Sequence, residues 1–303
     1  MVVDFAAAPA ASCGARPPCT GPDVPDPGPA AGGGALPGGG VSGGARDCVP
    51  PGPAELPDGP GAVGEGAGRR EPEAAAVEIT GLGYSWPGGG KVFEGLELRL
   101  SRGERLFVSG PSGCGKSTLL SLVAGIMLPD AGEIRVGGRS LAGMSGAARD
   151  RLRGDDIGYV FQQFNLVPYL TAIENVLLPC GFSRARRTRS LRQGGTPALA
   201  GRTLLERLGI PPGLHGRVAA RLSVGQQQRV AAARALIGTP PLLIADEPTS
   251  ALDEETGLAF VRLLMRECER AGSSLMFVSH DGSLASEFGR RLELGAPAPP
   301  AGG

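Results

Sequence analysis

Short, continuous apolar runs recur through the middle of the chain, separated by glycine-rich or charged segments. Residues 106–108, 242–245 and 275–278 are such runs, and runs of this length are typical of strands buried on both faces of a parallel sheet. Earlier in the chain, residues 77–79 and 96–100 predict strands of an antiparallel flank. The pattern therefore predicts an α/β fold with an antiparallel β flank.

A helical region is predicted between the first and second of the buried strands. Residues 230–236 form an alanine-rich stretch with strong helix propensity. Ser223 and Gln226 stand in the Ser-x-x-Gln relation of a capping box, which predicts Ser223 as the N-cap of that helix. We expect a helical subdomain over about residues 163–235.

Composition separates the ends of the chain from its middle. Residues 1–73 are dominated by Gly, Pro and Ala, and such a segment cannot bury enough surface to offset its ordering entropy. We expect a disordered tail or a wrongly extended start of translation, since the basic cluster and apolar region of a secretory signal are missing. Residues 297–303 predict a second tail, so the folded domain is expected over residues 74–296.

A glycine-rich segment with phosphate-binding character follows the first buried run. Residues 110–118 contain Gly-x-x-x-x-Gly-Lys-Ser. The glycines let successive N–H groups point at an anion, and the dipole of the following helix adds positive potential. Lys116 would reach the terminal phosphates and Ser117 would hold Mg²⁺. The residues expected to contact a nucleotide here are Gly110, Ser112, Gly113, Cys114, Gly115, Lys116, Ser117 and Thr118.

A glycine-rich surface turn is the competing interpretation of this loop, because the chain contains 51 glycines in 303 residues. A second signal weighs against it. Asp246 and Glu247 follow the apolar run 242–245, where Asp246 is placed to hold a water on Mg²⁺ and Glu247 to act as the general base for water attacking the γ-phosphate. Alone, Asp-Glu-Pro would be a capped turn, but paired with the loop it favours a site for ATP and Mg²⁺.

Together these segments resemble the nucleotide-binding subunit of an ABC transporter. Residues 110–118 resemble the Walker A motif, residues 222–226 the signature motif, and Asp246 with Glu247 the Walker B motif. The resemblance covers about residues 77–294. It implies a P-loop NTPase core of ABC type, carrying an antiparallel β flank and a helical subdomain.

The resemblance implies further site residues. Gln162 resembles the Q-loop glutamine, which is expected to contact Mg²⁺ and to take part in catalysis. Asp253 matches the D-loop aspartate, and His280 matches the catalytic switch histidine. Trp86 lies at the expected distance before the phosphate loop to stack on adenine, and Tyr84 is its competitor because alternate residues of a strand face the same side.

The resemblance also implies a homodimer of ATPase domains, because one copy leaves the far side of the γ-phosphate uncovered. The partner copy's signature segment, with its Ser223 hydroxyl, Gly225 N–H and neighbouring Gln226, is expected to cover it. Val224 stands where glycine is usual. At the first helical position its φ would be negative and a β-branched residue would fit, so we expect activity to survive.

Residues 164–176 are similar to ATPases of the lipoprotein-release, macrolide-export and cell-division type, whose permeases extract substrates from a membrane or transmit force across it. No apolar run approaches the roughly 20 residues needed to cross a bilayer. We therefore expect a permease on a separate chain, with this chain in the cytoplasm, peripheral on the inner face of the cell membrane. The link is expected to involve Gln162 and an apolar groove around Phe164, Leu166, Val167 and Tyr169.

Charge bears on the remaining alternatives. A net charge of +0 at pH 7 argues against nucleic-acid binding, which draws on an excess of Lys and Arg. The alternative function is a non-transport ABC ATPase acting on nucleic acid or ribosomes, although the long coiled coil, zinc ligands or tandem domains usual there are not visible. A local cluster of Arg184, Arg186, Arg187, Arg189 and Arg192 favours a solvated face, with contact to anionic lipid headgroups as the alternative.

Overall fold

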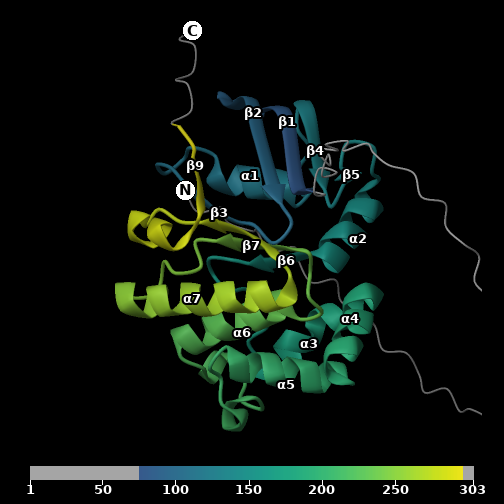
Figure 1. Ribbon diagram of the computed structural model, residues 1–303, viewed down its shortest axis with the longest axis vertical. Helices are drawn as coiled ribbons and strands as arrows, with labels where there is room; N and C mark the ends of the chain where they lie inside the picture. Colours follow the sequence, from purple (N-terminus) through teal and green to yellow (C-terminus); the bar gives the residue numbers. More distant parts are fainter. Residues whose placement is uncertain (1–74, 296–303) are drawn as a thin grey trace, which may run out of the picture. The chain divides into compact units, whose positions relative to one another are not determined.

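The computed structural model describes residues 75–295. The two predicted tails lie outside the described residues. Within them, one sheet is antiparallel and the other is parallel (Figure 1). The antiparallel sheet has the order β2-β1-β4-β5, with bounds β1 Ala75–Ser85, β2 Lys91–Ser101, β4 Ala131–Val136 and β5 Arg139–Ser140.

The parallel sheet lies at the centre of the described part of the chain. Its order is β6-β7-β8-β3-β9, with bounds β3 Arg105–Ser109, β6 Ile157–Val160, β7 Leu242–Asp246, β8 Ser274–Val278 and β9 Arg290–Glu293. The prediction of buried parallel strands is confirmed, because every residue of β8 is buried and β7 is buried up to its last residue. The predicted antiparallel flank is also confirmed, with Val77 paired to Leu100.

Helices cover both faces of the parallel sheet. Their bounds are α1 Lys116–Val123, α2 Gly146–Asp156, α3 Ala172–Phe182, α4 Arg184–Gly194, α5 Pro197–Arg207, α6 Val224–Leu236 and α7 Glu254–Ala271. In Figure 1, α1 lies between the two sheets, α6 and α7 lie below the parallel sheet, and α3, α4 and α5 lie beside α6. Short 3₁₀ turns occur at Pro212–Leu214, Ala219–Arg221 and Gly282–Glu287.

The core consists of two apolar clusters that share the parallel sheet. One joins the antiparallel sheet to α1 and includes Ile79, Leu120 and Ile244. The other joins α6 and α7 to the opposite sheet face and includes Phe107 and Phe260. Alternate strand residues face opposite sides of a sheet, so β3 and β7 supply both clusters and hold the segments that follow them in fixed positions.

The arginine cluster after α3 is not simply a solvated face, and that interpretation is wrong for two of its members. Arg186 is 2% exposed and donates to the carbonyl oxygens of Ala235 (2.9 Å) and Ile237 (3.2 Å). Arg189 donates to the carbonyl oxygen of Gly238 at 2.6 Å. The last carbonyls of a helix have no intrahelical partner, so these two guanidinium groups complete the end of α6. Burial lowers the pKa of Arg186 to about 10.

The other three arginines of the cluster, Arg184, Arg187 and Arg192, are exposed. They stay candidates for either of the two predicted roles, a solvated face or contact with anionic headgroups. Within residues 75–295, no helix combines the length and the apolar character that crossing a bilayer requires.

Candidate nucleotide-binding site

A cavity of about 500 Å³ opens where β3 leads into α1. Its lining combines the phosphate loop with the turn between β1 and β2 and one acidic residue after β7. The lining residues are Trp86, Gly90, Lys91, Val92, Ser112, Gly113, Gly115, Lys116, Ser117, Thr118 and Glu247. The cavity therefore contains most of the residues that the sequence predicted for the phosphate loop.

The loop needs its glycines for space and for backbone conformation. Gly115 is the N-cap of α1 with φ of 98°, and a Cβ there would come within 2.5 Å of Val92 Cγ1. Gly110 has φ of 153°, and a Cβ there would come within 2.6 Å of Cys114 Sγ. Side chains at either position would displace the loop, because L-residues rarely adopt these conformations.

Lys116 lies in the first turn of α1 and is 8% exposed. Its Nζ donates to the carbonyl oxygens of Gly110 (2.8 Å) and Pro111 (3.0 Å). A lysine ammonium has three donors, so one donor is left for an anion in the cavity. The loop thus holds a positive charge beside the N-terminus of a helix, which is itself favourable for phosphate.

Glu247 enters the same cavity from the other side. It follows β7 with φ of 44°, a left-handed conformation that is unusual for glutamate, and its N–H donates to the carbonyl oxygen of Val278 at 2.9 Å. Its Oε2 lies 3.3 Å from Nδ1 of His280, whose side chain is 61% exposed. Neighbouring parallel strands β7 and β8 therefore bring the two predicted catalytic residues together at their carboxyl ends.

Asp246 is the last residue of β7. Burial, and then the charge of Glu247, raise the pKa of Asp246, while a hydrogen bond from Ser117 and the charge of Lys116 oppose the rise. The Ser117 hydroxyl and the Asp246 carboxyl group therefore meet at the edge of the phosphate loop. Mg²⁺ is bound through oxygen, usually by one or two carboxylates plus phosphate and water, and this donor pair fits that requirement.

Trp86 lines the cavity and is 48% exposed, whereas Tyr84 is only 9% exposed and belongs to the core. Their rings meet edge to face with centroids 5.6 Å apart. The structure therefore favours Trp86 over Tyr84 as the surface available for stacking on a base.

Cys114 contributes no side chain to the cavity. It is 1% exposed and packs in the core, and its N–H donates to the Pro111 carbonyl at 3.3 Å.

The signature residues do not line this cavity. Ser223 caps α6 and forms the predicted capping box with Gln226, with N–H to side-chain oxygen distances of 3.0 and 3.3 Å, which confirms that prediction. Val224 is the first helical residue and does not have positive φ, as predicted, and it is 49% exposed. Gly225 follows it in the same turn.

Two other predicted site residues also lie outside the cavity. Asp253 caps α7, accepting a hydrogen bond from the Thr256 N–H at 2.9 Å, and this bond lowers the pKa of Asp253. Gln162 is exposed just beyond β6. The structure therefore gathers the Walker A and Walker B residues, with His280 against Glu247, and leaves the signature, Asp253 and Gln162 out of the lining of this cavity.

Sequence reasoning missed Gly90, at the end of the β1–β2 turn, and Lys91 and Val92, at the start of β2, which complete the cavity. Lys91 places a positive charge on the same side of the cavity as Trp86, and its Nζ is ion-paired with Glu94 at 2.8 Å. The only available signal was their position four to six residues after Trp86.

The apolar groove predicted around Phe164 is wrong in its composition. Phe164 is 7% exposed and Leu166 packs against the core, so of the four residues only Tyr169, at 77%, is largely exposed. A groove of about 270 Å³ does exist nearby, lined by Arg153, Gly154, Ile157, Tyr159, Phe161, Asn165, Pro179, Phe182, Arg186, Arg234 and Ala235. Phe182 stands at its edge with 89% exposure.

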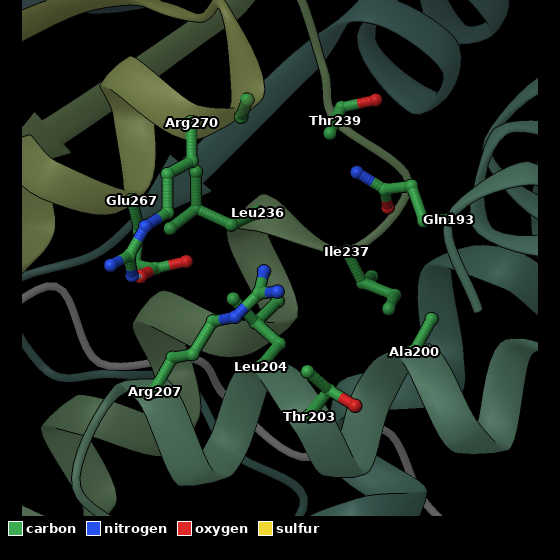
Figure 2. Close-up of a pocket in the computed structure, with 11 residues that line it drawn as sticks. Gln193, Ala200, Thr203, Leu204, Arg207, Leu236, Ile237, Thr239, Glu267 and Arg270 are labelled. Carbon is green, nitrogen blue, oxygen red and sulfur yellow. Dashed lines mark hydrogen bonds and ion pairs between the residues drawn. The ribbon is translucent and has the colours of Figure 1, made fainter.

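A different cavity lies between α5 and α7, and Figure 2 shows Thr203 and Arg207 on one side with Glu267 and Arg270 on the other. It measures about 70 Å³. Glu267 is 4% exposed and is ion-paired with Arg270. Because its buried charge is already paired, this cavity is a poor candidate for ligand binding.

A parallel sheet with a glycine phosphate loop, a Ser–Asp pair for a cation and a glutamate facing the cavity defines a P-loop nucleotide hydrolase. The comparisons with known proteins name the family. The profile described as "ABC transporter" matches residues 93–250. The chain belongs to the ABC transporter family and carries its ATP-binding, ATP-hydrolysing cassette.

Individual relatives agree with this assignment. The chain is 41% identical over 212 residues to the lipoprotein-releasing system ATP-binding protein LolD 1 of Caulobacter vibrioides, covering 67% of this chain and 84% of that protein. It is 42% identical over 203 residues to the uncharacterized ABC transporter ATP-binding protein YbbA of Escherichia coli K12, covering 67% and 86%.

A solved structure is also similar, namely the dimeric post-hydrolysis state of the ATP-binding cassette MJ0796 bound to ADP and Pi. The TM-score is 0.61 at 34% identity, with 72% of this chain and 94% of that chain covered.

Proposed function

We propose that two copies of this chain bind and hydrolyse ATP at shared sites and thereby drive a separate membrane permease. The observation that carries this proposal is the division of the site. Lys116 and Glu247 share one cavity, while the capped start of α6 is exposed outside it. A signature segment so placed can serve a nucleotide only if that nucleotide is held by another copy.

In the proposed reaction, Lys116 and the loop N–H groups hold the phosphates and Trp86 stacks on the base. Glu247 accepts a proton from the water that attacks the γ-phosphate. His280 lies against Glu247 and holds its carboxylate in position. Ser117 and Asp246 would hold Mg²⁺, with Gln162 approaching it from the end of β6, and the ion would neutralise charge on the phosphate oxygens.

The partner copy's Ser223 hydroxyl and Gly225 N–H would complete the enclosure of the γ-phosphate, with its Gln226 and Asp253 at the same interface. Charge-assisted hydrogen bonds contribute about 1.5–3 kcal/mol each, so four of them across two sites offer roughly 6–12 kcal/mol before the costs of association. Shifting a two-state equilibrium from 1:99 to 99:1 takes about 5.5 kcal/mol. ATP can therefore close the dimer, and loss of the γ-phosphate can open it.

The permease is the proposed partner at the groove beside Phe161 and Phe182. This groove joins apolar rings to the guanidinium groups of Arg153 and Arg234, so it suits an amphipathic helix with an acidic end. The chain would then lie on the inner face of the cell membrane. Since a relative is named a lipoprotein-releasing ATP-binding protein, we propose export or extraction of a membrane-embedded substrate as the work performed.

The test is Glu247→Gln, which keeps the shape of the side chain and removes the base. We expect ATPase turnover to fall at least a hundredfold, in line with the typical contribution of a general base, and an ATP-bound dimer to accumulate on size-exclusion chromatography. Lys116→Ala is the matched control and should abolish both nucleotide binding and dimer formation. An E247Q variant that binds ATP yet elutes as a monomer would contradict the shared site.

A further inference from the structure

Arg234 connects the signature helix to the segment that contains Gln162. It lies in the last turns of α6 and donates through Nη2 to the carbonyl oxygen of Phe164 at 2.6 Å and through Nη1 to that of Asn165 at 2.5 Å. An arginine fork binding two successive carbonyls fixes both the position and the orientation of a backbone. No motif in the sequence singled out this residue.

The two residues that Arg234 holds are in a strained conformation. Phe164 has φ of 57° and Asn165 has φ of 48°, in the left-handed region that is unfavourable for a bulky aromatic residue. Such strain persists only where surrounding contacts impose it. Phe164 is 7% exposed, so packing of its ring and the Arg234 fork both help to impose it.

The strained residues close the turn in which Gln162 stands. The N–H of Phe164 donates to the carbonyl oxygen of Phe161 at 3.0 Å, and that of Asn165 to the carbonyl oxygen of Gln163 at 2.5 Å. Gln162 lies between these acceptors and its side chain is exposed. Relaxing the backbone at Phe164 and Asn165 would therefore redirect Gln162.

We propose that Arg234 is a positioning residue that sets the direction of Gln162 from the signature helix. This inference rests on the proposed function, in which Ser223 meets the partner's nucleotide and Gln162 serves its own. Arg234 lies eleven positions after Ser223 along the axis of α6, or roughly 16 Å at 1.5 Å per residue. A shift of α6 on meeting the partner's γ-phosphate would thus reach the Gln162 segment directly.

Arg189 provides a matched control within the same structure. Like Arg234, it is half-buried and donates to a backbone carbonyl, that of Gly238 just beyond α6 at 2.6 Å, but it does not hold Phe164 or Asn165 and does not line the groove beside Phe161. Arg189→Ala should therefore lower stability without the loss of hydrolysis that we expect of Arg234→Ala.

The experiment is a double-mutant cycle in the full chain, measuring kcat for ATP and the affinity for ADP, which has no γ-phosphate. We expect Arg234→Ala to lower kcat about tenfold, the size of one charged hydrogen bond, with ADP affinity unchanged. If Arg234 acts through Gln162, R234A combined with Gln162→Ala will be no slower than Q162A alone, since residues that act as one unit are not additive. Arg189→Ala should keep the wild-type kcat, and Arg234→Lys should recover part of it.

The outcomes separate this inference from the proposed function. Q162A slowing hydrolysis while R234A matches the wild type would overturn the positioning role, as would full additivity of the two changes. A parallel loss of kcat in R189A and R234A would show that Arg234 has a purely structural role, and would also overturn the proposal. If the wild type itself lacks ATPase activity, or Q162A is as fast as the wild type, the failure lies with the proposed function.

Discussion

Two adjacent carboxylates at the end of β7, Asp246 and Glu247, take different positions because their surroundings differ. Asp246 completes the strand, whereas Glu247 departs from it with φ of 44° and so enters the cavity. The sequence predicted both residues for a nucleotide site only in combination with the phosphate loop, because an acidic pair after a buried strand would by itself be a capped turn. The left-handed turn that separates them depends on the hydrogen bond to Val278 in the next strand, and nothing local predicts it.

The raised pKa of Asp246 predicts that its ionised carboxylate, which is needed for Mg²⁺-dependent hydrolysis, lowers the stability of the folded protein. Burial and the charge of Glu247 disfavour the ionised carboxylate in the folded chain, so the folded state binds the proton more tightly than the unfolded state does. Stability is then lost as pH rises from the ordinary aspartate value through the raised one. Asp246→Asn should accordingly raise the melting temperature of the nucleotide-free protein at pH 7.5 and abolish Mg²⁺-dependent hydrolysis.

Thermal unfolding of the wild type and D246N at pH 7.5 and at acidic pH is the measurement. The difference in melting temperature between the two proteins should become smaller at acidic pH, where the Asp246 carboxyl group of the wild type is also neutral. A D246N variant less stable than the wild type at both values would mean that the hydrogen bond from Ser117 outweighs the charge repulsion.

At the scale of elements, helix ends could be predicted where the signal is short-range. The capping box of α6 uses Ser223 and Gln226, three residues apart, and it forms as expected. The role of Arg186 could not be predicted in the same way, because the carbonyls that it binds at Ala235 and Ile237 lie about fifty residues further along the chain. From its sequence alone, an arginine-rich helix is expected to be solvent-exposed. Only the fold shows that the end of another helix packs against it.

Ser223 has two separable tasks, the cap of α6 and the proposed contact with the partner's nucleotide. Ser223→Ala removes the cap and should cost about 1 kcal/mol of stability. Ser223→Asp keeps a good N-cap with a charge favourable to the helix dipole, so it should restore the melting temperature. Its carboxylate would nevertheless face the triphosphate across the dimer, and ATP-dependent dimerisation should be lost in an E247Q background.

Urea denaturation gives the stability of each Ser223 variant, and size-exclusion chromatography with ATP gives the dimer. Dimerisation of the S223D variant at the level of the E247Q parent would show that the start of α6 does not approach the γ-phosphate.

For the described part of the chain as a whole, the sequence predicted the layered α/β core because buried strands and the phosphate loop have strong patterns. It did not predict the cavity wall from Lys91 and Val92, since that contact depends on how the β1–β2 turn of one sheet meets the loop after β3 of the other. The groove beside Phe161 was missed for a similar reason. Phe164 was expected to line it but instead turns into the core through its left-handed backbone.

We expect the folding of this chain to be coupled to its ATP-dependent assembly. A ligand that binds only the folded state stabilises it by about 2.7 kcal/mol at a hundred times its Kd, whatever the protein concentration. Closure of two copies over ATP stabilises the folded state further, by an amount that depends on protein concentration. For the E247Q variant with ATP and Mg²⁺, we expect the melting temperature to rise with protein concentration. The range to measure is about 1 to 100 µM, which brackets a micromolar Kd for the dimer. With ADP the melting temperature should rise to one value that is independent of protein concentration.

The E247Q/S223D double variant is the control. It should behave with ATP as the E247Q parent does with ADP, because its phosphate loop is intact and only the face that meets the second copy is changed. A melting temperature independent of concentration for E247Q with ATP would mean that each copy encloses its nucleotide alone.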